Sequence, residues 1–234
     1  ALAEDASQAF ENYEVDTALT LALEANRIAD PPVQVQSVLS ELAPTAAIRR
    51  LEGHMGSVSA VAIGPDGTHA ISGGDDGLLL VWDLTSGQMT QTLTGHTDQV
   101  RSIAITPDGT RAISGADDAA VIVWDLETGT ALYTLTGHED DVFAVAVSPD
   151  GQHALSGSRD QTLILWNLDS GEMIRQYGAG DSGHDSRVTS VAFSPDGQTA
   201  LSGSADMTLM LWDVASGDIV GQLVGHEDVI TGAA

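Results

Sequence analysis

Short apolar runs alternate with polar turns along most of the chain. Four β-rich runs are each followed by the tripeptide Pro-Asp-Gly, and these runs are Val58–Ile63, Val100–Ile105, Val142–Val147 and Val188–Phe193. Pro presets φ, Asp bonds back to the backbone and Gly takes the left-handed position, so each tripeptide predicts a hairpin. A second strand, a Gly/Asp turn and an apolar run such as Leu78–Asp83 follow, and then a more polar outer strand such as Met89–Thr94. Runs that are apolar on both faces are typical of strands buried between neighbouring sheets.

A unit of 42 residues repeats along the chain, and each unit opens with a Gly-His pair. In four units the His and a Trp are 28 residues apart, and the third unit carries four extra residues within Gln176–His184. The pairs are Gly53-His54, Gly95-His96, Gly137-His138, Gly183-His184 and Gly225-His226, and the Trp residues are Trp82, Trp124, Trp166 and Trp212. This regularity indicates several copies of one structural unit.

The Gly-His and Trp-Asp signatures resemble those of the WD-repeat family, whose repeats of about 40–45 residues form the four-stranded blades of a β-propeller. The resemblance covers about residues 46–234 and implies an all-β fold. We expect blades at about 52–94, 95–136, 137–182 and 183–224, with a fifth blade beginning at residue 225. The family implies about seven blades. We therefore expect this propeller to be incomplete, with Ala46–Leu51 pairing with none of the four blades.

Residues 1–45 have a different pattern, which predicts a small α-helical appendage. Apolar residues from Leu2 to Tyr13 fall at helical spacing, Asp16 can cap a second helix, and Asp30-Pro31-Pro32 ends it. The stretch Leu19–Asn26 resembles the helical segment that precedes the propeller in some large bacterial signalling proteins. A plain amphipathic cap on the propeller is the alternative.

The charge is strongly one-sided, with 34 acidic residues, eight arginines and no lysine, for a net charge of −26. Such a field repels phosphates, so we expect no nucleic-acid partner and no anionic membrane surface. High-salt adaptation and a merely soluble acidic surface both remain open. No segment has the ~18 consecutive apolar residues of a membrane span. The absence of Cys leaves the compartment open between the cytoplasm and an extracytoplasmic domain of a membrane-anchored protein.

Each repeat also carries a His, a Ser, an Asp and a Trp at matching positions. The resemblance implies that the His bonds an Asp in the turn before the Trp strand, that this Asp and a strand Ser are linked, and that the Ser reaches the indole N–H. The four structural tetrads are His54, Ser72, Asp76, Trp82; His96, Ser114, Asp118, Trp124; His138, Ser156, Asp160, Trp166; and His184, Ser202, Asp206, Trp212. A catalytic Ser/His/Asp triad would be unique, so repetition in every blade favours a structural role.

No other motif indicates chemistry. His69 and His153 take equivalent positions in non-adjacent blades, which disfavours a shared metal, and Asp75-Asp76 lacks the rest of a calcium loop. Without Lys or Cys the chain has no phosphate-binding loop lysine, Schiff base or thiolate. We therefore expect no enzyme activity, no catalytic residue, no cofactor and no metal.

The remaining candidates are residues that would face a partner. In WD-repeat proteins the commonest docking surface is the top face around the central channel, formed by the starts of the inner strands and the turns before the Trp strands. The resemblance places the candidate partner-binding residues there: Arg101, Phe143, Asp141, Arg159, Arg187, Asp75 and Asp117. Each Arg could instead pair with a neighbouring Asp.

The expected function is a non-catalytic scaffold for protein–protein interactions, with a protein partner of unknown identity. Membership of a larger complex stays open. Two alternatives stay open. One is a regulatory or sensor propeller of a larger signalling enzyme whose catalytic module lies outside this chain, and the other is a structural subunit of a large assembly, with or without membrane attachment.

Overall fold

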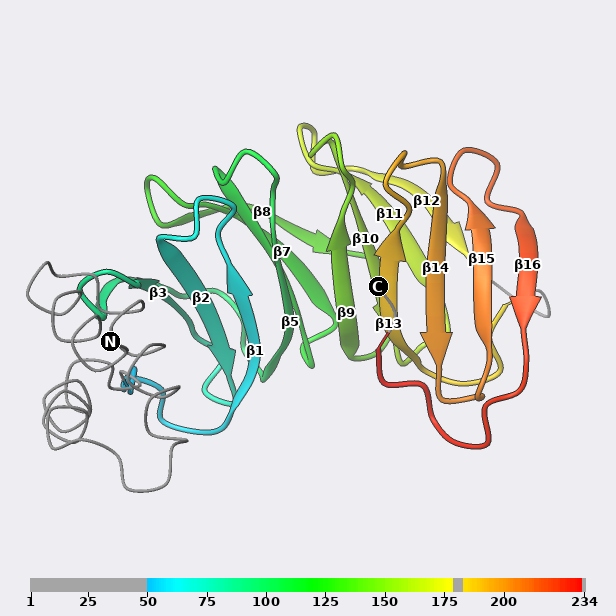
Figure 1. The fold of residues 1–234 in the computed structure, drawn as a ribbon, viewed down its shortest axis with the longest axis horizontal. Coiled ribbons are helices and arrows are strands. Elements are labelled where there is room, and N and C mark those ends of the chain that lie inside the picture. Colours follow the sequence, from blue (N-terminus) through cyan, green and yellow to red (C-terminus); the bar gives the residue numbers. More distant parts are fainter. Residues whose placement is uncertain (1–49, 179–182, 233–234) are drawn as a thin grey trace, which may run out of the picture. The chain divides into compact units, whose positions relative to one another are not determined.

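The computed structural model describes residues 50–178 and 183–232 of this chain, and they form sixteen strands (Figure 1). The first blade contains β1 (Val58–Ile63), β2 (His69–Gly74), β3 (Leu79–Asp83) and β4 (Gln88–Leu93). The second contains β5 (Val100–Ile105), β6 (Arg111–Ala116), β7 (Ala120–Asp125) and β8 (Thr130–Thr136). The third contains β9 (Val142–Val147), β10 (His153–Ser158), β11 (Leu163–Asn167) and β12 (Met173–Tyr177). The fourth contains β13 (Val188–Phe193), β14 (Thr199–Ser204), β15 (Leu209–Asp213) and β16 (Ile219–Leu223).

Each blade is a four-stranded antiparallel sheet whose strands follow one another in chain order. The all-β architecture predicted from the repeats is confirmed for the described residues, none of which lies in a helix. The predicted helical appendage at residues 1–45 lies outside them. The segment Ala46–Leu51 lies mostly outside them too, and its described residues Arg50 and Leu51 are not in a strand.

The Pro-Asp-Gly tripeptides form the hairpins between the first and second strands of the blades. In the first blade Gly67 has a φ of 69°, and its N–H donates to the Gly64 carbonyl at 2.9 Å. The Asp66 carboxylate accepts the Thr68 N–H at 3.0 Å, so a side-chain hydrogen bond also stabilises the turn. The left-handed glycine and the Asx bond are the features that the sequence pattern predicted.

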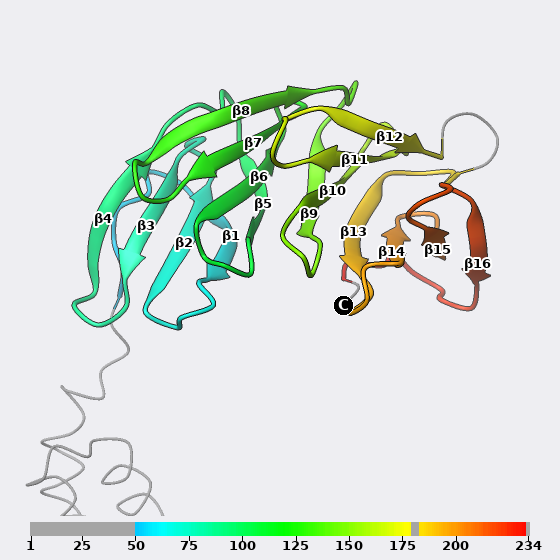
Figure 2. The same cartoon turned by 90° about the horizontal axis from the view of Figure 1, so that it is seen from above.

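The blades pack side by side through their inner strands: β1 contacts β5, β5 contacts β9, and β9 contacts β13 (Figure 2). At each junction a valine of the later blade enters a space above a glycine of the earlier one. A Cβ on Gly73, Gly115 or Gly157 would lie 2.5 Å from Cγ1 of Val100, Val142 or Val188, respectively. These three valines are fully buried, whereas the equivalent Val58 of β1 is 51 % exposed, because no described sheet covers that side of the first blade.

A β-bulge interrupts the start of every inner strand. In β5, for example, Val100 pairs with Ala116 and Ser102 pairs with Gly115, which leaves Arg101 without a partner on β6. The residues in the bulges are Ser59, Arg101, Phe143 and Thr189. A bulge redirects the side chain of the extra residue, so this irregularity sets the direction of four side chains at one end of the blades.

Candidate functional site

The structure brings the four residues of each tetrad into one continuous chain of hydrogen bonds. Across the four blades, His Nδ1 lies 2.8–2.9 Å from the Asp carboxylate, and His Nε2 lies 2.7–2.8 Å from Ser Oγ. The Trp Nε1–H donates to the same Ser Oγ at 2.7–2.8 Å. The Asp and the Ser are therefore joined through the imidazole ring rather than directly, which differs from the linkage that the family resemblance implied.

This order of contacts assigns the protons. An ionised Asp only accepts, so His Nδ1 carries a hydrogen and Nε2 accepts from the Ser hydroxyl, while the Ser oxygen accepts from the indole. Ser114, Ser156 and Ser202 are fully buried, and each oxygen is already engaged by Trp and His. Despite their Ser-His-Asp composition, these three tetrads present no accessible nucleophile.

In the second blade, electrostatics favour the charged carboxylate of Asp118 and the neutral imidazole of His96. Burial alone would raise the pKa of Asp118, but the Thr97 N–H and the paired His96 hold it below its usual value. Burial lowers the pKa of His96, against the opposing pull of Asp118. The same balance lowers the pKa of Asp76, Asp160 and Asp206.

The tetrad aspartates also fix the two loops that meet at the top of each blade. Asp118 accepts the N–H of Thr97, the residue after the Gly-His pair, at 2.9 Å, and the N–H of Ala120, at the start of the Trp strand, at 3.1 Å. A second bond joins the same loops, since the Asp117 N–H donates to the Gln99 carbonyl at 2.9 Å. The equivalent bonds in the other blades join Asp75 to Ser57, Arg159 to Asp141 and Ala205 to Arg187.

These bonds gather the predicted partner-binding residues on one surface, which we call the top face. It consists of Ser57, Ser59, Gln99, Arg101, Asp141, Phe143, Arg187, Thr189 and the turn residues Asp75, Asp117, Arg159 and Ala205. Arg101 binds Asp117 in a bidentate pair, with Nε and Nη2 at 2.6 and 2.5 Å from the two carboxylate oxygens. This pair, together with the charges of Asp141 and Asp75, raises the pKa of Arg101.

The other predicted residues of the top face form looser contacts. Arg159 Nη1 lies 3.2 Å from the Asp141 carboxylate. Asp75 accepts the Ser57 N–H at 3.2 Å. The half-buried ring of Phe143 is flanked by two guanidinium groups, with Cζ of Arg101 5.4 Å and Cζ of Arg187 5.7 Å from its centroid. This contact joins the second, third and fourth blades. The only sequence feature that pointed to it is that each of its three residues lies directly before or after the first valine of an inner strand.

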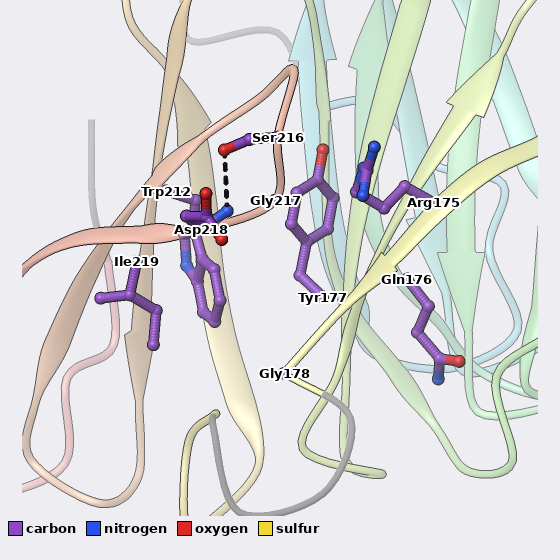
Figure 3. Close-up of a pocket in the computed structure, with 9 residues that line it drawn as sticks. All are labelled: Arg175, Gln176, Tyr177, Gly178, Trp212, Ser216, Gly217, Asp218 and Ile219. Carbon is purple, nitrogen blue, oxygen red and sulfur yellow. Dashed lines mark hydrogen bonds between the residues drawn. The ribbon is translucent and has the colours of Figure 1, made fainter.

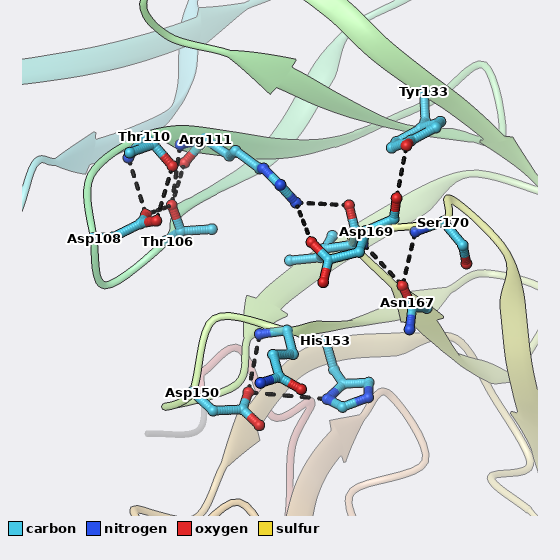
Figure 4. A network of polar contacts seen from close by, with 12 residues as sticks. Thr106, Asp108, Thr110, Arg111, Tyr133, Asp150, His153, Asn167, Asp169 and Ser170 are labelled. Carbon is cyan, nitrogen blue, oxygen red and sulfur yellow. Dashed lines mark hydrogen bonds and ion pairs between the residues drawn. The ribbon is translucent and has the colours of Figure 1, made fainter.

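The opposite end of the blades carries contacts that sequence reasoning missed (Figure 4). Arg111 of the second blade donates from Nη1 to the Leu168 carbonyl of the third at 2.7 Å and pairs with Asp169 at 3.1 Å. Tyr133 donates its hydroxyl to the Asp169 carbonyl at 2.7 Å. The side chain of His153 is about one-third exposed and faces Asp150. The bonds of Arg111 and Tyr133 join the second blade to the third.

A pocket lies between the outer strands of the third and fourth blades (Figure 3). Tyr177 and Trp212 meet there edge to face, with ring centroids 5.8 Å apart. Burial raises the pKa of Tyr177 to about 12, and its hydroxyl donates to the Val214 carbonyl at 2.9 Å. On the other side of the pocket, in the turn before β16, the Asp218 N–H donates to Ser216 Oγ at 3.2 Å. The pocket therefore shows no reactive constellation.

Residues 50–178 and 183–232 hold neither a cluster of metal-ligating side chains nor a membrane-spanning helix. No three His, Asp or Glu side chains of this part come together as potential metal ligands. None of its segments forms a helix that could span a bilayer.

Comparison with known proteins gives short matches to several proteins of plants and fungi. The chain is 57 % identical over 44 residues to the small ribosomal subunit protein RACK1y of Oryza sativa, which covers 19 % of this chain and 13 % of that protein. It is 44 % identical over 41 residues to the cross-pathway control WD-repeat protein 2 of Flammulina velutipes, covering 18 % and 13 %. The ribosome biogenesis protein erb1 of Neurospora crassa is 49 % identical over 45 residues, covering 19 % and 6 %.

The matched segments thus span about an eighth or less of those relatives, and a bacterial origin gains no support from them. The family described as "WD domain, G-beta repeat" matches at four places, and the matched residues are 46–83, 87–125, 129–167 and 175–213. They make up more than half of the chain and include the second and third strands of every described blade. Four four-stranded sheets and four family matches in register with them lead to one conclusion: the chain belongs to the WD-repeat family.

Proposed function

We propose that this chain is a non-catalytic scaffold that binds a protein partner on its top face, and that the tetrads are structural. WD repeats suggest a protein-interaction role, and one similar protein bears a name that makes it part of a ribosomal subunit, which is a large assembly. No observation on the described residues favours the alternatives of a sensor attached to an enzyme or a membrane-attached subunit.

One observation carries the proposal: identical tetrads support a surface that differs from blade to blade. The bulge that turns a side chain away from the ladder holds Ser59 in the first blade, Arg101 in the second, Phe143 in the third and Thr189 in the fourth. If the bulges served only the fold, one residue type would suffice in every repeat. Variation on a constant framework is typical of a recognition surface.

Site-specific photo-crosslinking in the cells that produce the protein tests this proposal. A photoreactive amino acid replaces the exposed Glu139, beside the top face, and in a matched variant it replaces the exposed Thr110, at the opposite end of the blades. We expect a discrete protein adduct from position 139 that is absent from position 110. The adduct should disappear when Phe143→Ala is added. Equal adducts from both positions, or an adduct unaffected by Phe143→Ala, would show that the top face is not the binding surface.

A further inference from the structure

Arg187 is the cation of the top face that has no carboxylate partner among the described residues. The other two arginines of this face each form an ion pair, Arg101 with Asp117 and Arg159 with Asp141. Arg187 is exposed, and its side chain contacts the ring of Phe143. In a chain with 34 acidic residues and eight arginines, a top-face arginine left without a carboxylate needs a specific cause.

The cause lies in the turn beside Arg187. In the third blade the residue before the strand valine is Asp141, and the turn residue bonded to its carbonyl, Arg159, supplies the opposite charge. In the fourth blade the same two positions hold Arg187 and Ala205, whose N–H donates to the Arg187 carbonyl at 3.0 Å. The backbone arrangement is kept, but the side chain that would supply the counter-charge is reduced to a methyl group.

Phe143 holds the guanidinium of Arg187 where a partner can reach it. A guanidinium over an aromatic ring is attracted by about 0.5–1 kcal/mol at an exposed site. Its planar donors remain able to bind a carboxylate through two parallel hydrogen bonds. Arg101, on the same ring, is already neutralised by Asp117, so it fixes the ring without competing for the anion of a partner.

We propose that Arg187, on the ring of Phe143, is a subsite for an aspartate or glutamate side chain of the partner protein. This inference rests on the proposed function and specifies the chemistry of its partner. The net charge of −26 alone would favour a basic partner. However, charges are screened beyond about 8 Å at physiological ionic strength, so the local arginine decides the contact that forms at this position.

The net charge of the chain favours basic peptides, whereas the proposed subsite favours acidic ones. Randomised heptapeptides displayed on phage and selected against the full chain at physiological salt distinguish the two. We expect peptides with Asp or Glu at a fixed position, against the overall charge of the protein. The best peptide is then synthesised with an amidated C-terminus, so that only side-chain carboxylates remain, and its affinity is measured by fluorescence anisotropy. Arg187→Gln should weaken binding about tenfold or more, the effect of losing a charge-assisted pair.

Ala205→Asp is the second variant, because it supplies an internal counter-charge at a position where Asp75 and Asp117 stand in other blades. It should weaken the peptide as strongly as Arg187→Gln. The matched control is Arg111→Gln at the opposite end of the blades, whose guanidinium is already paired with Asp169 and which should bind the peptide as the parent does.

Three results would overturn the acidic subsite: selection of basic or uncharged peptides, unchanged affinity in Arg187→Gln, or an equal loss in Arg111→Gln. None of them removes the scaffold function, because the crosslinks from position 139 and their dependence on Phe143 do not require an acidic partner. If the crosslinking fails and the acidic peptide still requires Arg187, the carboxylate-binding site stands, but the proposed docking of a protein partner on the top face is wrong.

Discussion

Replacing Ser114 by Ala tests the tetrads most directly, because one hydroxyl oxygen joins two buried partners. It accepts the Trp124 Nε1–H at 2.8 Å and lies 2.7 Å from His96 Nε2. Ser114 and Trp124 are fully buried, so no water can replace the hydroxyl without a rearrangement. The smaller Ala side chain introduces no clash, so the substitution isolates the lost hydrogen bonds.

The magnitude follows from the two groups left without partners. Each buried polar group deprived of its hydrogen bond costs about 1–3 kcal/mol, so Ser114→Ala should lower the free energy of unfolding by about 2–6 kcal/mol. The matched control is Ser86→Ala in an exposed turn, where Ser86 Oγ donates to Asp83 at 3.0 Å. Exposed substitutions of this kind usually stay within about 0.5 kcal/mol.

Urea unfolding followed by tryptophan fluorescence measures both variants, since each tetrad contains one of the four tryptophans. A double-mutant cycle with Trp124→Phe separates the hydrogen bond from the volume that is lost with the indole. We expect a coupling of about 1 kcal/mol, because the second substitution removes the donor that the first left unpaired. A cost for Ser114→Ala equal to that of Ser86→Ala, or strict additivity with Trp124→Phe, would refute the structural role of the tetrad.

Three further expectations concern stability. Burial lowers the pKa of His96 from its usual 6.5, so between the two pKa values the unfolded chain binds more protons than the folded chain. The stability that the neutral His96 contributes is therefore present above pH 6.5 and is lost as the pH falls through the lowered pKa. We expect a lower Tm at about pH 5.5 than at about pH 7.5. Gly115→Ala should cost about 1–3 kcal/mol in urea unfolding because its Cβ overlaps Val142, whereas Gly232→Ala, with open space around it, should change little. Tyr133→Phe, which loses the hydrogen bond to the Asp169 carbonyl of the next blade, should lower the free energy of unfolding by about 0.5–1.5 kcal/mol. An unchanged free energy of unfolding would show that this bond does not stabilise the contact between the blades.

The sequence predicted the blades well because their spacing and their turns carry strong local signals. A fixed interval between Gly-His and Trp places the tetrads, and Pro-Asp-Gly selects one hairpin geometry, so both strand order and strand ends follow. The backbone conformation of the turn before the Trp strand could not be predicted as well from the sequence. It requires a positive φ, which Gly77 supplies in the first blade, but Ala119, Gln161 and Met207 adopt the same conformation at 62–74°. Here the constant framework of the tetrad overrides the local preference of the residue.

The contacts of the top face could not be predicted in the same way. A bulge adds one residue to a strand without changing the apolar pattern, so nothing in the sequence shows that Arg101 or Phe143 leaves the ladder. The stacking on Phe143 joins strands from three blades, and it depends on distances between sheets that local patterns do not encode. The charge on Arg187 was visible, whereas the missing counter-charge at Ala205 became meaningful only through comparison with the bonded turn of the third blade.

Two adjacent positions in each turn explain how one fold can present different partner surfaces. The second position is always the tetrad aspartate, while the first is Asp75, Asp117, Arg159 or Ala205. Partly exposed ion pairs at the first position contribute about 0–1 kcal/mol, so their replacement alters recognition at little cost to folding. Stability and binding should therefore separate. Ala205→Asp should weaken acidic-peptide binding about tenfold or more with almost no change in Tm, whereas Ser114→Ala should lower the Tm and leave the affinity of the folded protein intact.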